Sequence, residues 1–277
     1  MAVRISFPAE KAIEARLRLP ASKSISNRAL LICALGGLDS RIDNLSTSDD
    51  TVRLSKILAG ALSWNDCGDG GTTSRFLLAY CCVKGLDVEI KGSDQLNARP
   101  VAELVDALNA LGAKIIYGDR EGYLPVRTGK GKLIGGDLKV RGDVSSQFVS
   151  SLMMIGPLLE RGLKLSIEGE VLSRSYIEMT ASVMRHYGVD VTLHENEIII
   201  NEASYMGNHL HVEPDWSAAS YWFEACALRN GSRIELSGLA ADSLQGDSVV
   251  VSMMKNLGVK TDFIGDNPIK SVLTPRF

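Results

Sequence analysis

The stretch "VAELVDALNALGAKIIY" (residues 101–117) combines two structural signals. Its apolar residues recur with a helical period as far as Leu111, and Gly112 is followed by a short β-type run. A glycine at this place ends a helix in the left-handed conformation, and the run behind it is typical of a strand. The stretch therefore predicts a helix that ends at a glycine and leads directly into a strand.

The same pattern recurs along the chain. "YIEMTASVMRHYGVDVTL" (176–193) and "SVVVSMMKNLGVKTDFI" (248–264) carry Gly188 and Gly258, which follow Gly112 at intervals of 76 and 70 residues. A weaker relative, "TVRLSKILAGALSW" (51–64), carries Gly60. Self-similarity at a nearly constant spacing indicates an internal structural repeat.

A second set of helical runs alternates with the first. Each follows a lead-in of Ser, Thr, Gly and Asp, the residues that cap helix N-termini. The four runs are "SKSISNRALLICALGG", "GDGGTTSRFLLAYCCVKG", "GDVSSQFVSSLMMIGPLL" and "PDWSAASYWFEACALRNG". Short strand-like runs lie between them, so the pattern predicts an α/β protein whose repeats pack helices inward against small sheets.

Composition limits the classes of function. The chain has 277 residues, 45% of them hydrophobic and 23% charged, with a net charge of −3. This is typical of a soluble protein of one or two domains, and it favours neither a nucleic acid nor a membrane as partner. We find neither a signal peptide nor a long apolar segment, so we expect a cytoplasmic location. The five cysteines form no CxxC pair, which predicts reduced, buried thiols.

Two cations stand at the start of a predicted helix in "LPASKSISNRALLI" (19–32), namely Lys23 and Arg28. A helix N-terminus is already partly positive, so nearby cations are unfavourable there unless an anion offsets them. If the helix begins near Ser24, these groups form a site for a phosphate or a carboxylate. The alternative is that both cations pair with the acidic run "TSDD" at 47–50.

Three further lead-ins have a similar character. "GDGGTTSRF" (68–76) places glycines ahead of Arg75, although it lacks the GK[ST] of a Walker loop. "NARPVAEL" (97–104) places Arg99 before a proline that suits the first helical position. "GDVSSQF" (142–148) offers Ser145, Ser146 and Gln147 as neutral ligands for an anion or hydroxyls. Plain helix capping by Ser145 or Ser146 remains the alternative.

Taken together, these motifs resemble those of the 5-enolpyruvylshikimate-3-phosphate synthase family, in order and at about the expected separations. The motifs are "LPASKSISNRALLICAL", "DCGDGGTTSRFLL", "NARPVAELVDALNALGA", "GDVSSQFVSSLMM", "SRSYIEMT" and "VEPDWSAASYWF". The resemblance implies transfer of the enolpyruvyl group of phosphoenolpyruvate to the 5-hydroxyl of shikimate 3-phosphate, with release of phosphate, on the pathway to chorismate and aromatic amino acids. It implies two lobes of βαβαββ repeats, an inside-out α/β barrel type.

The resemblance also implies roles for individual residues. Shikimate 3-phosphate would be held by Lys23, Ser24, Arg28, Ser145, Ser146, Gln147, Ser173 and Tyr176. Phosphoenolpyruvate would be held by Lys23, Gly71, Arg99 and Gln147, with Lys23 acting electrostatically in catalysis. Gly71 would leave room for the inhibitor glyphosate. No metal or organic cofactor is implied, and His209 and His211 on one predicted strand have no evident third ligand.

Two features depart from the family pattern. Asp69 stands where the family usually has an uncharged residue, and its carboxylate would repel an anionic substrate. Family members are also longer, and their proton-transfer residues would lie beyond Phe277. We therefore expect lobe II with three repeats at 21–228, and a partial lobe I from 1–20 and 229–277. The tail "DFIGDNPIKSVLTPRF" (262–277) departs from a strand pattern.

Three alternatives to an active synthase remain open. The first is a truncated lobe that binds substrate without turnover, monomeric like the family or self-associated through the apolar run near 248. The second is a relative of the transferase that acts on UDP-N-acetylglucosamine, which the absence of a cysteine before Arg99 disfavours. The third is nucleic-acid binding through the related RNA cyclases, which the acidic balance opposes.

Overall fold

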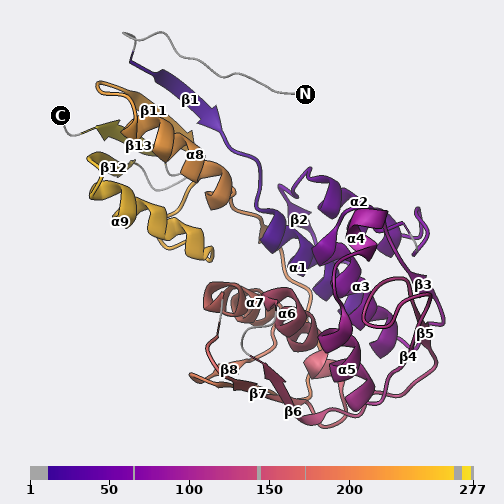
Figure 1. Ribbon diagram of the computed structural model, residues 1–277. Coiled ribbons are helices and arrows are strands. Elements are labelled where there is room, and N and C mark those ends of the chain that lie inside the picture. Colours follow the sequence, from indigo (N-terminus) through magenta and orange to yellow (C-terminus); the bar gives the residue numbers. More distant parts are fainter. Residues whose placement is uncertain (1–11, 65, 142–144, 172, 265–269, 276–277) are drawn as a thin grey trace. The chain divides into compact units, whose positions relative to one another are not determined.

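The computed structural model describes residues 12–64, 66–141, 145–171 and 173–264, together with the backbone of 270–275. The chain forms two units (Figure 1). The larger unit is Ser22–Val212, and the smaller unit joins Met1–Ala21 to Glu213–Phe277. Each unit is built from helices on small sheets, which confirms the predicted α/β class.

The larger unit contains most of the elements. Its helices are α1 (Lys23–Gly36), α2 (Asp49–Leu58), α3 (Gly71–Val83), α4 (Asp94–Asn97), α5 (Ala102–Ala110), α6 (Ser146–Ile155) and α7 (Arg174–His186). Its strands are β2 (Ile42–Asp43), β3 (Glu89–Ile90), β4 (Lys114–Tyr117), β5 (Val126–Gly129), β6 (Gly136–Arg141), β7 (Leu163–Glu168), β8 (Thr192–Leu193), β9 (Glu197–Ile200) and β10 (Leu210–His211).

Helices α3 and α6 form the centre of the larger unit. Nearly every residue of α3 is buried, and α6 is buried without interruption from Phe148 to Ile155. A helix that is apolar on all sides must be surrounded by other elements. These two helices pack on each other, α6 packs on α7, and α3 also packs on α1 and α2. The sheets lie outside this helical core (Figure 1).

One sheet of the larger unit completes the predicted repeat. Its strand order is β6-β7-β9-β8, with β6 and β7 parallel and the other pairs antiparallel. With α6 and α7 as crossovers, this is one βαβαββ repeat. The other described sheets are smaller, β3-β5-β4 and β10-β2. Within the described residues of the larger unit, the four-stranded arrangement occurs in one sheet, and the expectation of three such repeats stays a prediction.

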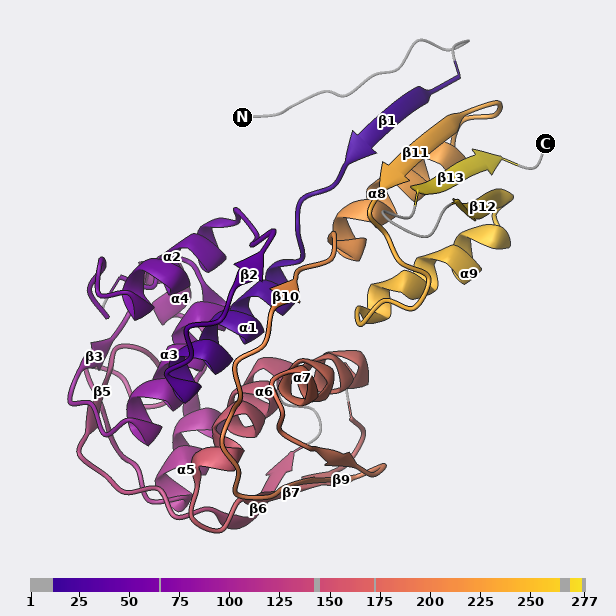
Figure 2. The ribbon, with the colours of Figure 1, turned by 180° about the vertical axis from the view of Figure 1, so that it is seen from behind.

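The smaller unit has the same topology. Its elements are β1 (Glu14–Arg18), α8 (Trp216–Ala227), β11 (Arg233–Ser237), α9 (Val250–Lys255), β12 (Val259–Ile264) and β13 (Lys270–Pro275). The strand order is β1-β11-β13-β12, with only β1 and β11 parallel among the described pairs (Figure 2). This order matches β6-β7-β9-β8 element for element, so the unit is a further βαβαββ repeat whose first strand comes from the other end of the chain.

Two expectations about the smaller unit are wrong. The expected boundary at 228 lies instead between Val212 and Glu213, because Trp216 and Phe223 of α8 are buried in one core with Ile234 of β11. The tail was expected to leave the strand pattern, yet β12 and β13 pair from Val259↔Pro275 to Ile264↔Lys270. Pairing with a neighbouring strand offsets the weak pattern of the segment.

Local predictions were more successful. Gly60, Gly112, Gly188 and Gly258 all have positive φ at helix ends, as the repeat pattern predicted. The cysteines Cys33, Cys67, Cys81, Cys82 and Cys226 are free and buried, which confirms the expectation of reduced thiols. Among the described residues, we find no helix with the length and apolarity needed to cross a membrane.

Candidate active site

Lys23 is the first residue of α1, one position earlier than expected, and Ser22 caps the helix by accepting a hydrogen bond from the Ile25 amide. The Lys23 ammonium lies 3.2 Å from Asp50 Oδ2, and its side chain is 44% exposed. The alternative that this cation pairs with the acidic run at 47–50 is therefore correct for Lys23. Asp50 lies in the first turn of α2, where a carboxylate also offsets the helix dipole.

The same alternative is not met for Arg28, which is buried and donates to hydroxyls and carbonyls rather than to an acidic residue. Its guanidinium donates to Thr180 Oγ1 at 2.7 Å, Ser150 Oγ at 2.9 Å and the Ser24 carbonyl at 2.9 Å, with a longer contact to the Tyr176 carbonyl. These acceptors belong to α1, α6 and α7. The guanidinium thus joins the N-terminal turns of α1 and α7 to α6.

Burial has an electrostatic consequence for Arg28. Its side chain is 2% exposed, and no carboxylate among the described residues forms an ion pair with it. Desolvation lowers the pKa of Arg28 to about 10, so the group stays protonated at neutral pH. Hydroxyls, backbone carbonyls and the rings of Phe76 and Tyr176 take the place of a counter-ion.

Three predicted site residues from distant parts of the chain meet at the start of α3. A Cβ added to Gly71 would lie 3.3 Å from Arg99 Nη1 and 3.6 Å from Gln147 Oε1. The side-chain amide of Gln147 also donates to Thr72 Oγ1 at 3.1 Å, which joins α6 to α3. Gly71 is buried, Gln147 is half-buried and Arg99 is exposed, so the group reaches the surface.

Arg75 belongs to the same cluster, although its motif implied no ligand for it. Its Nη1 would be 3.0 Å from that added Cβ, and it donates to the Gly71 carbonyl at 3.0 Å. Its Nη2 donates to the Pro100 carbonyl at 3.1 Å. Its place in the first turn after a glycine-rich lead-in was the available signal. Pro100 itself lies outside the helix, since α5 begins at Ala102.

The predicted hydroxyl residues occupy two further helix starts. Ser145 is the N-cap of α6, and its hydroxyl accepts a hydrogen bond from the backbone N–H of Gln147 at 3.3 Å. The alternative of plain helix capping is therefore correct for Ser145. Ser146 is the first residue of α6. Ser173 has φ +60° at the N-cap position of α7, without a side-chain capping bond, and its carbonyl accepts from the Tyr176 amide.

The Asp69 carboxylate accepts a hydrogen bond from a neighbouring serine. The Ser93 hydroxyl donates to Asp69 Oδ1, and Ser93 is the N-cap of α4. The carboxylate is exposed and held by this contact two residues before Gly71. His209 contacts Asp43 Oδ2 at 2.9 Å, and the described residues contain no group of three or more possible metal ligands.

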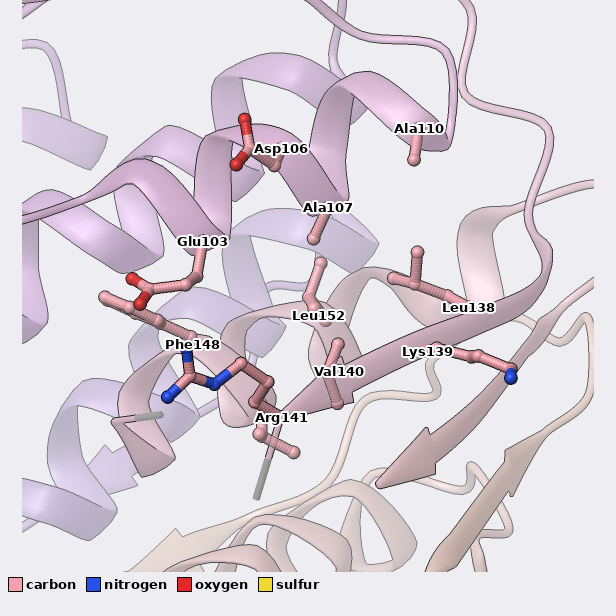
Figure 3. Close-up of a pocket in the computed structure, with 11 residues that line it drawn as sticks. Glu103, Asp106, Ala107, Ala110, Leu138, Lys139, Val140, Arg141, Phe148 and Leu152 are labelled. Carbon is pink, nitrogen blue, oxygen red and sulfur yellow. The ribbon is translucent and has the colours of Figure 1, made fainter. Parts of the chain in front are cut away.

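A pocket of about 320 Å³ lies beside this cluster, between α5, β6 and α6 (Figure 3). It is lined by Glu103, Asp106, Ala107, Ala110, Leu138, Lys139, Val140, Arg141, Phe148, Val149 and Leu152. Its lining is mainly apolar, and the predicted site residues are not part of it. Phe148 connects the two regions, because the guanidinium carbon of Arg75 lies 5.1 Å from its ring centroid. The cluster itself, with several cations at helix starts, is the better candidate for an anionic ligand.

The chain is similar to known proteins over most of its length. A family model described as EPSP synthase (3-phosphoshikimate 1-carboxyvinyltransferase) matches residues 8–64 and 56–272. The chain belongs to the EPSP synthase family. The 3-phosphoshikimate 1-carboxyvinyltransferase of Bacteroides fragilis (strain YCH46) is 41% identical over 262 residues, covering 94% of this chain and 64% of that relative. The corresponding protein of Haemophilus ducreyi is 34% identical over 278 residues, covering 89% and 63%.

The solved structures support the fold. An EPSP synthase from Acinetobacter baumannii superposes with a TM-score of 0.78 at 19% identity, covering 97% of this chain and 67% of the other. This likeness confirms the predicted enolpyruvyl transferase type of fold. The chain spans about 64% of the length of the Bacteroides relative.

Proposed function

We propose that this chain binds shikimate 3-phosphate and phosphoenolpyruvate as part of a 3-phosphoshikimate 1-carboxyvinyltransferase. The reaction would transfer the enolpyruvyl group to the 5-hydroxyl of shikimate 3-phosphate, giving 5-enolpyruvylshikimate 3-phosphate and phosphate. The observation that carries the proposal is the meeting of Gly71, Arg99 and Gln147, which come from three separate motifs. Membership of the family and the relatives' names support the same reaction.

The chemistry of this cluster suits phosphoenolpyruvate. The first N–H groups of α3 have no partner within the helix, Gly71 places no side chain beside Arg99, and Arg99 supplies a fork of N–H donors. Phosphate and carboxylate groups both match such donors. Gln147 adds a neutral group that can bond an oxygen without changing the charge. Donors held in place before the substrate arrives stabilise charge that develops during transfer.

The proposed shikimate 3-phosphate side uses the starts of α1, α6 and α7. The hydroxylated cyclohexene carboxylate and its phosphate would be contacted by Lys23, Ser24, Ser145, Ser146, Ser173 and Tyr176. Lys23 would have to exchange Asp50 for a substrate anion, and Arg28 would have to exchange one of its protein acceptors. We therefore assign Arg28 chiefly to holding these helix starts together. The larger unit would be the shikimate-phosphate lobe of a cytoplasmic enzyme.

Binding without turnover is the second candidate, because the chain matches only 64% of the Bacteroides relative's length. The two candidates differ in one measurement. Continuous release of phosphate when both substrates are present would show turnover. Saturable binding of both substrates without phosphate release would show a binding unit alone.

Calorimetric titration with each substrate tests the proposed site. We expect the chain to bind shikimate 3-phosphate, and phosphoenolpyruvate in its presence. Gly71→Ala should weaken the binding of phosphoenolpyruvate by about tenfold, since the alanine Cβ would lie 3.0 Å from Arg75 Nη1 and 3.3 Å from Arg99 Nη1. Lys23→Ala should weaken both ligands. Arg127→Ala is the matched control, because Arg127 lies on β5 outside the cluster and pairs with Asp87.

The result that would contradict the proposal is equally specific. A folded chain that binds neither ligand would contradict it. Binding of a UDP sugar in place of shikimate 3-phosphate would identify the related transferase instead.

A further inference from the structure

Arg75 is a buried cation whose donors are directed at two segments of backbone. The side chain lies on α3 and the residue is 8% exposed. Nη1 donates to the Gly71 carbonyl in the same helix, and Nη2 donates to the Pro100 carbonyl, 25 residues further along the chain. Pro100 directly follows Arg99. One guanidinium therefore connects the start of α3 to the segment that carries the second arginine of the cluster.

The surroundings of Arg75 are unusual for a structural arginine. Its Nε is buried without a hydrogen-bond partner among the described residues. Burial lowers its pKa, and the nearby charge of Arg99 lowers it further. A buried cation beside a second cation costs free energy, which hydrogen bonds or a bound anion would offset. The aromatic face of Phe148 on α6 offsets part of this cost.

We propose that Arg75 is a positioning residue for the anion site formed by Gly71, Arg99 and Gln147. This proposal rests on the proposed function, and it adds a residue to the phosphoenolpyruvate side of that site. Both Nη atoms are already engaged with carbonyls, so Arg75 acts through the groups it holds. It fixes the start of α3, the Arg99 segment and, through Phe148, the helix that carries Gln147.

The geometry explains why an arginine is required. Its planar fork can donate to two carbonyls at once, whereas a lysine ammonium has one nitrogen at the end of a flexible stem. Arg75→Lys keeps the positive charge and removes the bridge between the Gly71 and Pro100 carbonyls. Arg75→Met removes the bridge and the charge. Comparing the two variants separates positioning from simple attraction of an anion.

The first test measures the affinity of the full 277-residue chain for shikimate 3-phosphate, and for phosphoenolpyruvate in its presence. We expect both Arg75 variants to bind phosphoenolpyruvate about tenfold more weakly and shikimate 3-phosphate within about twofold of the unmodified chain. A general loss of structure would weaken both ligands alike. Arg127→Met, which removes an exposed arginine of β5, should change neither affinity. Full affinity for phosphoenolpyruvate in Arg75→Lys would overturn the positioning role.

A second measurement needs no ligand, and it distinguishes failure of this proposal from failure of the proposed function. In NMR spectra of the free chain, Arg75→Lys should shift the backbone amide signals of Arg99 and Val101 as well as those of α3. The Arg127→Met spectrum should retain them. Shifts confined to α3, with the Arg99 signal unchanged, would overturn the proposal even if both substrates bind.

Discussion

At the scale of single residues, the larger unit holds two buried arginines without carboxylate partners among its described residues. Arg28 satisfies its donors with the Thr180 and Ser150 hydroxyls and with backbone carbonyls, whereas Arg75 leaves its Nε unpaired. Buried charge is normally neutralised by an ion pair or by a ligand. The different degree of satisfaction is consistent with the two roles proposed here, one holding helix starts together and the other preparing an anion site.

The buried thiols lead to a prediction about pH. Burial raises the pKa of Cys67 and of Cys82 to about 12, whereas an unfolded thiol has a pKa of about 8.5. Above about pH 8.5 the unfolded chain releases these thiol protons while the folded chain keeps them. The folded state therefore has its full stability below about pH 8.5 and loses stability as the pH rises towards 12. We expect the free energy of unfolding in urea to fall between pH 8 and pH 10.5, by up to roughly 1.4 kcal/mol per pH unit for each thiol.

Substitution and thiol labelling provide the controls. Cys67→Ala should reduce the slope with pH, and a thiol reagent at pH 8 should label the five buried cysteines only on unfolding. Rapid labelling of two or more thiols in the native chain would contradict the burial described here. An unchanged slope in the Cys67→Ala variant would assign the pH dependence to other groups.

At the scale of elements, the glycines that end helices differ in what surrounds them. Gly112 after α5 and Gly60 after α2 both have positive φ, which an alanine adopts at a cost of about 1 kcal/mol. A Cβ on Gly112 would also lie 2.4 Å from the Lys132 carbonyl oxygen, whereas a Cβ on Gly60 would meet no atom within 4 Å. Gly112 therefore allows close approach of two backbone segments as well as ending a helix.

Matched alanine substitutions test this difference. Gly60→Ala should lower the free energy of unfolding by about 1 kcal/mol, and Gly112→Ala by about 3 kcal/mol or more, because backbone must move as well. Urea denaturation followed by circular dichroism measures both values. Equal losses in the two variants would show that the Lys132 contact relaxes without cost.

At the scale of the whole molecule, the smaller unit exposes an apolar stripe around α9. Val249, Met253 and Leu257 are spaced four residues apart, and each is more than half exposed. Met253 lies on α9, Val249 directly precedes the helix and Leu257 follows its C-cap, and neighbouring exposed apolar side chains favour association. The chain should therefore associate as its concentration rises, in line with the apolar run near residue 248.

Analytical ultracentrifugation of charged variants checks this expectation. Met253→Lys combined with Leu257→Lys should shift the chain towards monomer at concentrations where the unmodified chain associates. Ile116→Lys is the matched control, since Ile116 is a 69% exposed apolar residue on β4 of the larger unit. A chain that remains monomeric at all concentrations without substitution would contradict the prediction.

Much of the local structure could be predicted because it depends on neighbouring residues. The helix-ending glycines, the capping serines Ser22 and Ser145 and the buried thiols follow from propensity and short-range hydrogen bonding. The prediction that a helix begins at Pro100 was wrong, because Pro100 forms an antiparallel β-bridge with Tyr123 and α5 begins at Ala102. The tail was misjudged because a strand can be stabilised by its partners rather than by its own pattern.

The order and spacing of motifs were sufficient to predict the α/β class, the repeated helix–glycine–strand pattern and the family. Tertiary structure decided which charges are paired, which are buried and which side chains share a site. It paired β1 with β11, joining Glu14 to Arg233, and it brought Gly71, Arg99 and Gln147 together. Such contacts depend on how distant helices and strands pack, and that packing reflects the summed burial of many side chains rather than the chemistry of any one segment.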